Sequence, residues 1–127
     1  MSHTDFRPLT NKEQAILARL AEAPLPDIES IKRQMARAQA KTLDANGSLE
    51  FRVASGVPAI SIDGALVTGS QADEDTTENY SPYVQCVLFS RNGFISHLDV
   101  YKDDGSKIKT TIDPAKFILT YGTPPKS

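Results

Sequence analysis

The chain of 127 residues contains few of the residues that disulfide bonds and metal sites require. Cys86 is its one cysteine, so no disulfide can form within the chain, and a reducing compartment is expected. The two histidines, His3 and His97, lie far apart in the sequence and form no pair that could begin a metal site. We therefore expect neither a metal nor another cofactor.

The sequence also lacks the common motifs of catalytic and membrane proteins. No Gly-x-Gly-x-x-Gly or Gly-Lys-Ser/Thr loop is present to hold a phosphate, and no serine lies in a Gly-x-Ser-x-Gly elbow. No stretch approaches the roughly 20 apolar residues of a membrane span, and the first residues do not resemble a signal peptide. A net charge of −2 offers no general field for DNA or RNA. A soluble cytoplasmic protein is expected.

Two short helices are predicted in the N-terminal third. Thr10 and Glu13 have the spacing of a capping box, so a helix is expected to begin there and to end before Pro24. Asp27 is expected to cap a second helix, in which apolar residues recur every three or four positions. The apolar stripes are too narrow to form a core alone, so this αα-hairpin must pack on another element.

The rest of the chain alternates between apolar and polar residues and contains two hairpin signals. A three-residue loop at 45–47, with Gly47 in the left-handed conformation, is predicted to place Leu43 opposite Leu49.

A similar loop at 91–93 is predicted to place Cys86 opposite Leu98 and Val84 opposite Val100 on one face of the sheet. In this apolar strand the thiol of Cys86 is expected to be a core group with a raised pKa. The other face would carry Tyr83, Val87 and Phe89 opposite Tyr101, His97 and Ile95.

Together these patterns predict one α+β domain, in which an N-terminal αα-hairpin packs on a mostly antiparallel sheet of about five or six strands. The expected segments are a leader at 1–9, the αα-hairpin at 10–40, the sheet at 41–121 and a disordered tail at 122–127.

The face of the second hairpin that carries the tyrosines is the strongest candidate for a functional surface. Tyr83, His97 and Tyr101 are rigid amphipathic groups of the kind enriched at protein interfaces, and Asp99 lies in the same row. Such a row of histidine, aspartate and tyrosine also has the groups that acid–base catalysis uses. Alternatively, the two helices cover this face, and the tyrosines are core residues.

Two charged clusters are candidates for electrostatic contacts. One is acidic and lies in a predicted loop: Asp73, Glu74, Asp75 and Glu78. It lacks the spacing of a calcium-binding EF-hand, and it is either a solvated loop or a surface that speeds association with a basic partner. The other is basic: Lys32, Arg33, Arg37 and Lys41. Arg33, Arg37 and Lys41 would lie along one helical face and could contact phosphates if the second helix continued, although a solvated helix is the simpler interpretation.

Three motifs occur in order along almost the whole chain: Phe6–Thr10 with Glu13 (FRPLT..E), Asn46–Phe51 (NGSLEF) and Leu98–Ser106 (LDVYKDDGS). Together they resemble a bacterial family of small uncharacterised domains. Members of that family resemble, in size and composition, the immunity proteins that neutralise toxins of competing bacteria. The resemblance implies a protein-binding inhibitor and supplies no catalytic residues. The chain departs from the family pattern between Thr68 and Tyr83, where it has a longer polar loop.

We therefore expect the protein to bind and inhibit another protein, most concretely a bacterial toxin domain whose active site it occludes. The expected contact surface is Tyr83, His97, Asp99 and Tyr101, supplemented by the acidic cluster. Two other classes stay open, namely a small hydrolase or transferase using His97 and Asp99, and a nucleic-acid-associated regulator using the basic second helix. A pocket around His97 would favour the enzyme, and an open sheet would favour the binder.

Overall fold

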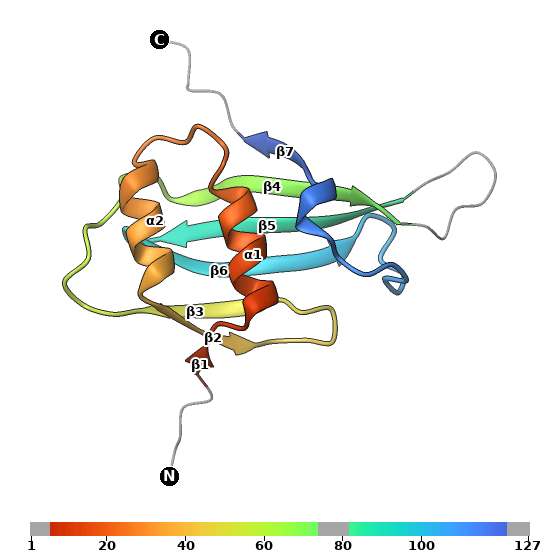
Figure 1. Ribbon diagram of the computed structural model, residues 1–127, viewed down its shortest axis with the longest axis horizontal. Helices are drawn as coiled ribbons and strands as arrows, with labels where there is room; N and C mark the ends of the chain where they lie inside the picture. Colours follow the sequence, from red (N-terminus) through yellow and green to blue (C-terminus); the bar gives the residue numbers. More distant parts are fainter. Residues whose placement is uncertain (1–5, 74–81, 122–127) are drawn as a thin grey trace.

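The computed structural model describes residues 6–73 and 82–121, which form one antiparallel sheet with two helices on one of its faces (Figure 1). The seven strands are arranged in the order β1-β2-β3-β6-β5-β4-β7. They are β1 (Arg7–Pro8), β2 (Ala38–Thr42), β3 (Leu49–Val53), β4 (Gly64–Ala72), β5 (Tyr83–Arg91), β6 (Phe94–Lys102) and β7 (Ile118–Tyr121). The helices are α1 (Asn11–Leu20), α2 (Ile28–Ala36) and the 3-10 turn η1 (Pro114–Lys116).

The predicted α+β class is confirmed, and the sheet has more strands than the five or six expected. β1 lies in the expected leader, and β2 begins inside the segment assigned to helices. A strand as short as β1 contains too few residues to display an alternating pattern. The paired αα-hairpin is not confirmed, because α1 contacts β4 and η1 whereas α2 contacts β6. Every helix in the described ranges is too short or too polar to cross a membrane.

Helix α1 begins with the predicted capping box. The backbone N–H of Glu13 donates to the Thr10 hydroxyl at 3.1 Å, and the N–H of Thr10 donates to the Glu13 carboxylate at 2.9 Å. The Arg7 guanidinium donates two further hydrogen bonds of 2.8 Å to this carboxylate and one to the Thr42 hydroxyl. The Arg7 hydrogen bonds hold the pKa of Glu13 below its usual range. This carboxylate therefore joins β1 and α1, and Arg7 extends the connection to β2.

Helix α2 begins directly after Asp27, but Asp27 does not cap it as predicted. Asp27 has a φ of 60°, and its side chain makes no hydrogen bond to the first turn of the helix. Its carboxylate instead accepts hydrogen bonds from the backbone N–H of Ser61 at 3.0 Å and from the Ser61 hydroxyl at 2.9 Å. These bonds lower the pKa of Asp27. The cap was predicted from sequence proximity, whereas the partner that competes for the carboxylate lies 34 residues away.

The β2–β3 hairpin has a longer loop than predicted. The N–H of Leu43 donates to the carbonyl of Ser48 at 2.8 Å, so the loop consists of residues 44–47. The prediction that Leu43 lies opposite Leu49 is wrong, because Thr42 pairs with Leu49 and Leu43 is exposed.

A side chain stabilises this longer loop. The Asp44 carboxylate accepts hydrogen bonds of 3.0 Å from the N–H groups of Asn46 and Ser48, which is the pattern of an Asx-turn. Gly47 has the predicted positive φ, 96°, a conformation that is strained for residues with a side chain.

The β5–β6 hairpin occupies the middle of the sheet, and its register differs from the prediction by two residues. Its loop is Asn92–Gly93, in which both residues have a positive φ, as in a two-residue type I′ turn. Cys86 therefore lies opposite Val100, and Leu98 lies opposite Leu88.

A β-bulge in the same hairpin changes the side on which one residue lies. The register shifts between Phe89 and Ser90, after which Ser90 pairs with Ile95. Ile95 was expected opposite Phe89, on the face that carries the tyrosines, but it is buried on the helix-covered face. The other residues assigned to the two faces of this hairpin lie on the predicted sides.

The helix-covered face of the sheet forms the hydrophobic core. Its most deeply buried side chains include Leu20, Ile31, Leu49, Val84, Leu88, Ile95 and Leu98. Cys86 lies among them without exposed surface, and burial raises the pKa of its thiol to about 12. The prediction that Cys86 is a core thiol is confirmed.

Buried amide side chains complete the hydrogen bonding where strands end. Gln34 on α2 accepts a hydrogen bond from the N–H of Ile95 at 2.8 Å and donates to the carbonyls of Pro58 and Gly93. It therefore attaches α2 to the β5–β6 turn. Gln34 is fully buried, and these three partners are backbone groups in or beside turns and loops.

The end of the sheet near β4 is closed in a similar way. Gln71 accepts from the N–H of Asp113 at 2.7 Å and donates to the carbonyl of Thr111 at 3.0 Å. Beside it, Asp73 and Lys102 form a 3.0 Å ion pair, and their side chains are at most 1% exposed. These groups hold the segment that leads from β6 to η1 against the sheet.

We expect the free energy of unfolding to fall above pH 9 because of Cys86. The unfolded thiol ionises near its ordinary pKa of 9.0, whereas the folded thiol stays protonated up to about pH 12. The neutral thiol's contribution is complete below pH 9 and is lost as the pH rises, by at most about 1.4 kcal/mol per pH unit. Urea unfolding on both sides of pH 9 measures this slope, which Cys86→Ala should reduce. Equal slopes in the two proteins would contradict the assignment.

We expect Lys102→Met to destabilise the fold by about 3–5 kcal/mol, because it leaves the buried Asp73 carboxylate without its cation. Asp73→Asn combined with Lys102→Met removes both charges and should cost less than Lys102→Met alone. Lys32→Met is the matched control, since Lys32 forms an exposed 3.9 Å pair with Glu29 and its loss should cost about 0.5 kcal/mol or less. Equal urea midpoints for Lys102→Met and Lys32→Met would refute a structural role for the buried pair.

Candidate functional site

The sheet face opposite the helices carries all four residues of the predicted contact surface. Tyr83 lies on β5, and His97, Asp99 and Tyr101 alternate along β6, whereas both helices lie on the other side (Figure 1). Tyr101 is 44% exposed, and the other three are half-buried. The alternative that the helices cover these residues is wrong. We call this surface the open face, and its central residues are Glu50, Ser70, Tyr83, Gln85, Phe89, His97, Asp99 and Tyr101.

The imidazole of His97 is oriented by its neighbours. Its ring stacks on Phe89, directly opposite on β5, with the centroids 4.5 Å apart and the planes 9° from parallel. Nδ1 lies 3.0 Å from the Ser96 hydroxyl, and Nε2 lies 3.8 Å from a carboxylate oxygen of Asp99. The second distance is longer than a hydrogen bond, so histidine and carboxylate are neighbours without a direct proton-transfer contact.

Gln85 occupies the middle of the open face and was not among the residues predicted for a functional surface. It pairs with Tyr101 across the strands, where Tyr83 was expected. Its side chain accepts from the Ser70 hydroxyl at 2.5 Å and donates to the Asp103 carboxylate at 2.9 Å. This polar bridge fixes β4, β5 and the end of β6 relative to one another. In a sequence, an outward-facing residue of this kind is indicated by a polar side chain that lies between two apolar ones in a predicted strand.

Cations stacked on an aromatic ring form a second group that was not predicted from the sequence. The guanidinium carbon of Arg52 lies 4.5 Å from the centre of the Phe6 ring, and the Lys41 ammonium lies 5.8 Å from it. Strand pairing also places Lys41 opposite Glu50 and Glu50 opposite His97. Alternating charges therefore continue the row of His97 toward the β1 edge of the sheet.

Arg33, Arg37 and Lys41 of the predicted basic cluster do not lie along one helical face. Helix α2 ends at Ala36, Arg37 is outside the helical conformation, and Lys41 lies on β2. Only Lys32 and Arg33 of this cluster belong to the helix. The chain turns into a strand here because Ala38 to Thr42 pair with β3.

Of the predicted acidic cluster, the structure describes Asp73 alone. Asp73, expected in a solvated loop, is 1% exposed and lies in the ion pair with Lys102. Glu74, Asp75 and Glu78 lie outside the described residues. Within the part of the chain that the structure describes, no three His, Cys, Asp or Glu side chains gather to hold a metal ion.

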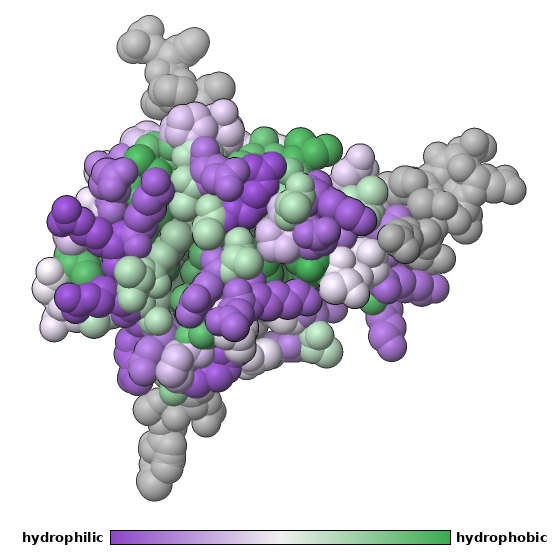
Figure 2. All heavy atoms as spheres, viewed as in Figure 1, coloured by the Kyte–Doolittle hydropathy of each residue, from purple (hydrophilic) through white to green (hydrophobic). Residues whose placement is uncertain are grey.

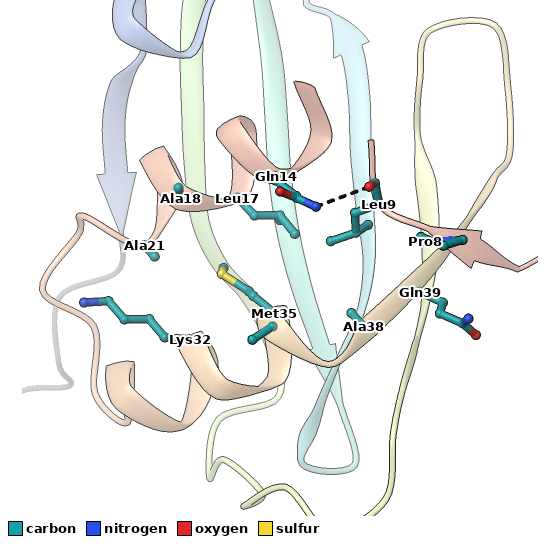
Figure 3. Close-up of a pocket in the computed structure, with 11 residues that line it drawn as sticks. Pro8, Leu9, Gln14, Leu17, Ala18, Ala21, Lys32, Met35, Ala38 and Gln39 are labelled. Carbon is teal, nitrogen blue, oxygen red and sulfur yellow. Dashed lines mark hydrogen bonds between the residues drawn. The ribbon is translucent and has the colours of Figure 1, made fainter. Parts of the chain in front are cut away.

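A groove of about 600 Å³ separates the two helices (Figure 3). Its walls include Leu17 and Ala18 of α1 and Met35 and Ala36 of α2. The band between the helices is pale green in Figure 2, which marks mildly apolar residues, and it lies between more hydrophilic surfaces. None of the residues predicted for the contact surface lines this groove.

The three sequence motifs mainly hold the fold together. In the second motif, the Ser48 hydroxyl accepts from the N–H of Val100 at 2.8 Å, and Asn46 donates to the Val100 carbonyl at 3.2 Å. These side chains connect the β2–β3 loop to β6, beyond the two residue pairs that join β3 and β6. In the third motif, Asp99 and Tyr101 lie on the open face, while the other side of the strand faces the core.

Neither a curated protein nor a solved structure matches the chain. A family model described as "Domain of unknown function (DUF6984)" matches residues 6–112, which include both helices and strands β1 to β6. The three motifs and the open-face residues of β5 and β6 lie within the matched segment. Since the match covers most of its length, the chain belongs to the DUF6984 family of domains of unknown function.

Proposed function

We propose that the protein binds and inhibits another protein through the open face, and most concretely that it is an immunity protein that occludes the active site of a bacterial toxin domain. The observation that carries this proposal is the row of amphipathic side chains on β5 and β6, Tyr83, His97, Asp99 and Tyr101, opposite the helix-covered face. Tyrosine is among the residues that contribute most to binding at protein interfaces.

The open face is pre-organised for binding. His97 is stacked on Phe89, and Gln85 is hydrogen-bonded on both sides, so these groups lose little conformational freedom when a partner arrives. Strands are spaced about 4.8 Å apart and rise about 3.3 Å per residue, so the strands from β2 to β4 span about 20 Å, and the longest of them, β4, β5 and β6, are about 30 Å long. This size is comparable with the about 800 Å² that each partner buries in a standard interface.

A hydrolase or transferase that uses His97 and Asp99 is less well supported. An enzyme holds its substrate in a concave site that brings the reacting atoms together. One face of the His97 ring is occupied by Phe89, and neither His97 nor Asp99 lines the inter-helix groove. The same geometry suits a binding surface, where aromatic and charged groups need exposure rather than enclosure.

The charges on the open face favour a partner protein that carries both positive and negative groups on its own surface. Lys41 and Arg52 lie toward the β1 edge, and Asp99 and Asp103 lie on and after β6. A partner must match both groups, which supports specificity more than general affinity. Glu74, Asp75 and Glu78 stay in the proposal as residues that accelerate association with a basic partner. Asp73 leaves it, because its carboxylate is buried.

We expect Tyr101→Ala to weaken binding of the cognate toxin by about 30-fold, the equivalent of about 2 kcal/mol, without lowering the melting temperature. The cognate toxin is first identified by capture on the intact chain from the native host. Its affinity for the wild type and the variant is then measured by calorimetry, and protection is measured as growth of cells that co-express toxin and variant.

Tyr121→Ala is the matched control. Tyr121 is 41% exposed, close to Tyr101 in accessibility, but strand pairing places it on the other side of the sheet, on β7. This variant should bind and protect like the wild type. Equal binding by the two variants, or full protection by Tyr101→Ala, would exclude the open face as the inhibitory surface.

A further inference from the structure

The two edges of the sheet differ in their protection against strand addition. β1 has two residues, one of which is Pro8 without an N–H, and the Arg7 side chain is engaged by Glu13. β7, at the opposite edge, has four residues and contains no proline and no charge (Figure 1). Charges, prolines and short strands are the usual devices that prevent another chain from pairing with a sheet edge. The β7 edge lacks both charges and prolines.

Exposed apolar surface is concentrated on the same short strand. Ile118 is 59% exposed and Tyr121 is 41% exposed. They are two of the five large apolar residues that are exposed in the described part of the chain. The sequence from Phe117 to Tyr121, FILTY, consists of residues that favour β-structure or bury readily.

β7 is firmly attached to the rest of the fold. Phe117, just before it, is buried above Gly69, where a side chain would collide with the Phe117 ring. Arg19 of α1 donates hydrogen bonds to the carbonyls of Phe117 at 2.7 Å and Pro114 at 3.2 Å. The outer edge of β7 is therefore an ordered row of backbone groups.

We infer that β7 pairs antiparallel with β7 of a second copy of this chain, so that two sheets become one continuous sheet. Residues directly opposite in an antiparallel pair must point to the same face. Ile118 and Thr120 lie on the open face, across from Ser70 and Thr68, and Leu119 points to the helix side with Gly69. A two-fold axis at Leu119 therefore places Ile118 opposite the partner's Thr120 and Leu119 opposite the partner's Leu119.

The absence of charge favours a second copy as the occupant. Because β7 carries no charge, pairing with its own copy brings no like charges together in any register. An acidic or basic foreign strand would find no complementary charge on it. The two-fold axis also keeps both open faces on the same side of the joined sheet. This inference is independent of the proposed inhibitory function, because it uses only the edge.

Sedimentation of the intact chain over a range of concentrations tests the dimer. The expected result is a reversible monomer–dimer equilibrium, accompanied by slower amide hydrogen exchange at Ile118–Tyr121 as the concentration rises. A chain that remains monomeric at all concentrations, or exchange at β7 that does not depend on concentration, would overturn the inference. Hydrogen exchange needs no variant, so it gives an answer even if a substitution disturbs folding.

Charge variants test the register. I118K/T120K places lysines directly opposite each other in the dimer and should weaken it by at least about tenfold. I118K/T120E places each lysine opposite a glutamate of the partner and should restore it. L43K is the matched control, because Leu43 is 49% exposed but lies in the β2–β3 connection, near the other edge. L43K should dimerise like the wild type, and an intact dimer of I118K/T120K would overturn the β7 pairing.

Discussion

The whole structure depends on covering one face of a seven-stranded sheet with two helices of ten and nine residues. Helices of this length cannot cover so wide a sheet, and irregular segments complete the layer. Irregular segments bring backbone N–H and C=O groups into the interior, where each needs a partner. Gln34, Gln71 and Asp73 supply these partners from positions next to the places where strands end.

The buried Asp73–Lys102 pair also supplies hydrogen-bond partners to the backbone of an irregular segment. Asp73 accepts from the N–H of Lys109 at 3.1 Å, and Lys102 donates to the carbonyl of Lys107 at 3.3 Å. The two charged side chains thus hold a segment without secondary structure while neutralising each other. A buried pair of this kind adds little net stability compared with apolar residues, but the loss of one partner is costly. Its contribution is to determine where the segment packs.

With both helices on one side, the opposite face of the sheet has to be stable without a helical layer. Alternation along β5 and β6 meets this requirement, because apolar residues face the core and amphipathic ones face outward. The open face is therefore a consequence of the fold as well as the proposed binding surface. The family match ends at Ile112, before η1 and β7, so the unprotected edge lies outside the segment that the family model describes.

Local patterns in the sequence were enough to predict the α+β class, the Thr10 capping box, the burial of Cys86 and the face on which Tyr83 and Tyr101 lie. Each of these depends on neighbours a few residues away or on strict alternation, which a single sequence displays. Local patterns could not predict the register of β5 and β6, since a bulge and a two-residue turn change it while preserving most of the alternation.

The tertiary structure alone decided which distant groups compete for a side chain. Asp27 bonds to Ser61 instead of capping its helix, and Asp73 pairs with Lys102 instead of facing solvent. The physical reason is that hydrogen bonds and ion pairs depend on separation in space, and burial makes an unmade bond costly. Sequence patterns describe separation along the chain, which was sufficient for the Thr10 cap and for most strand faces but not for the partners of buried polar groups.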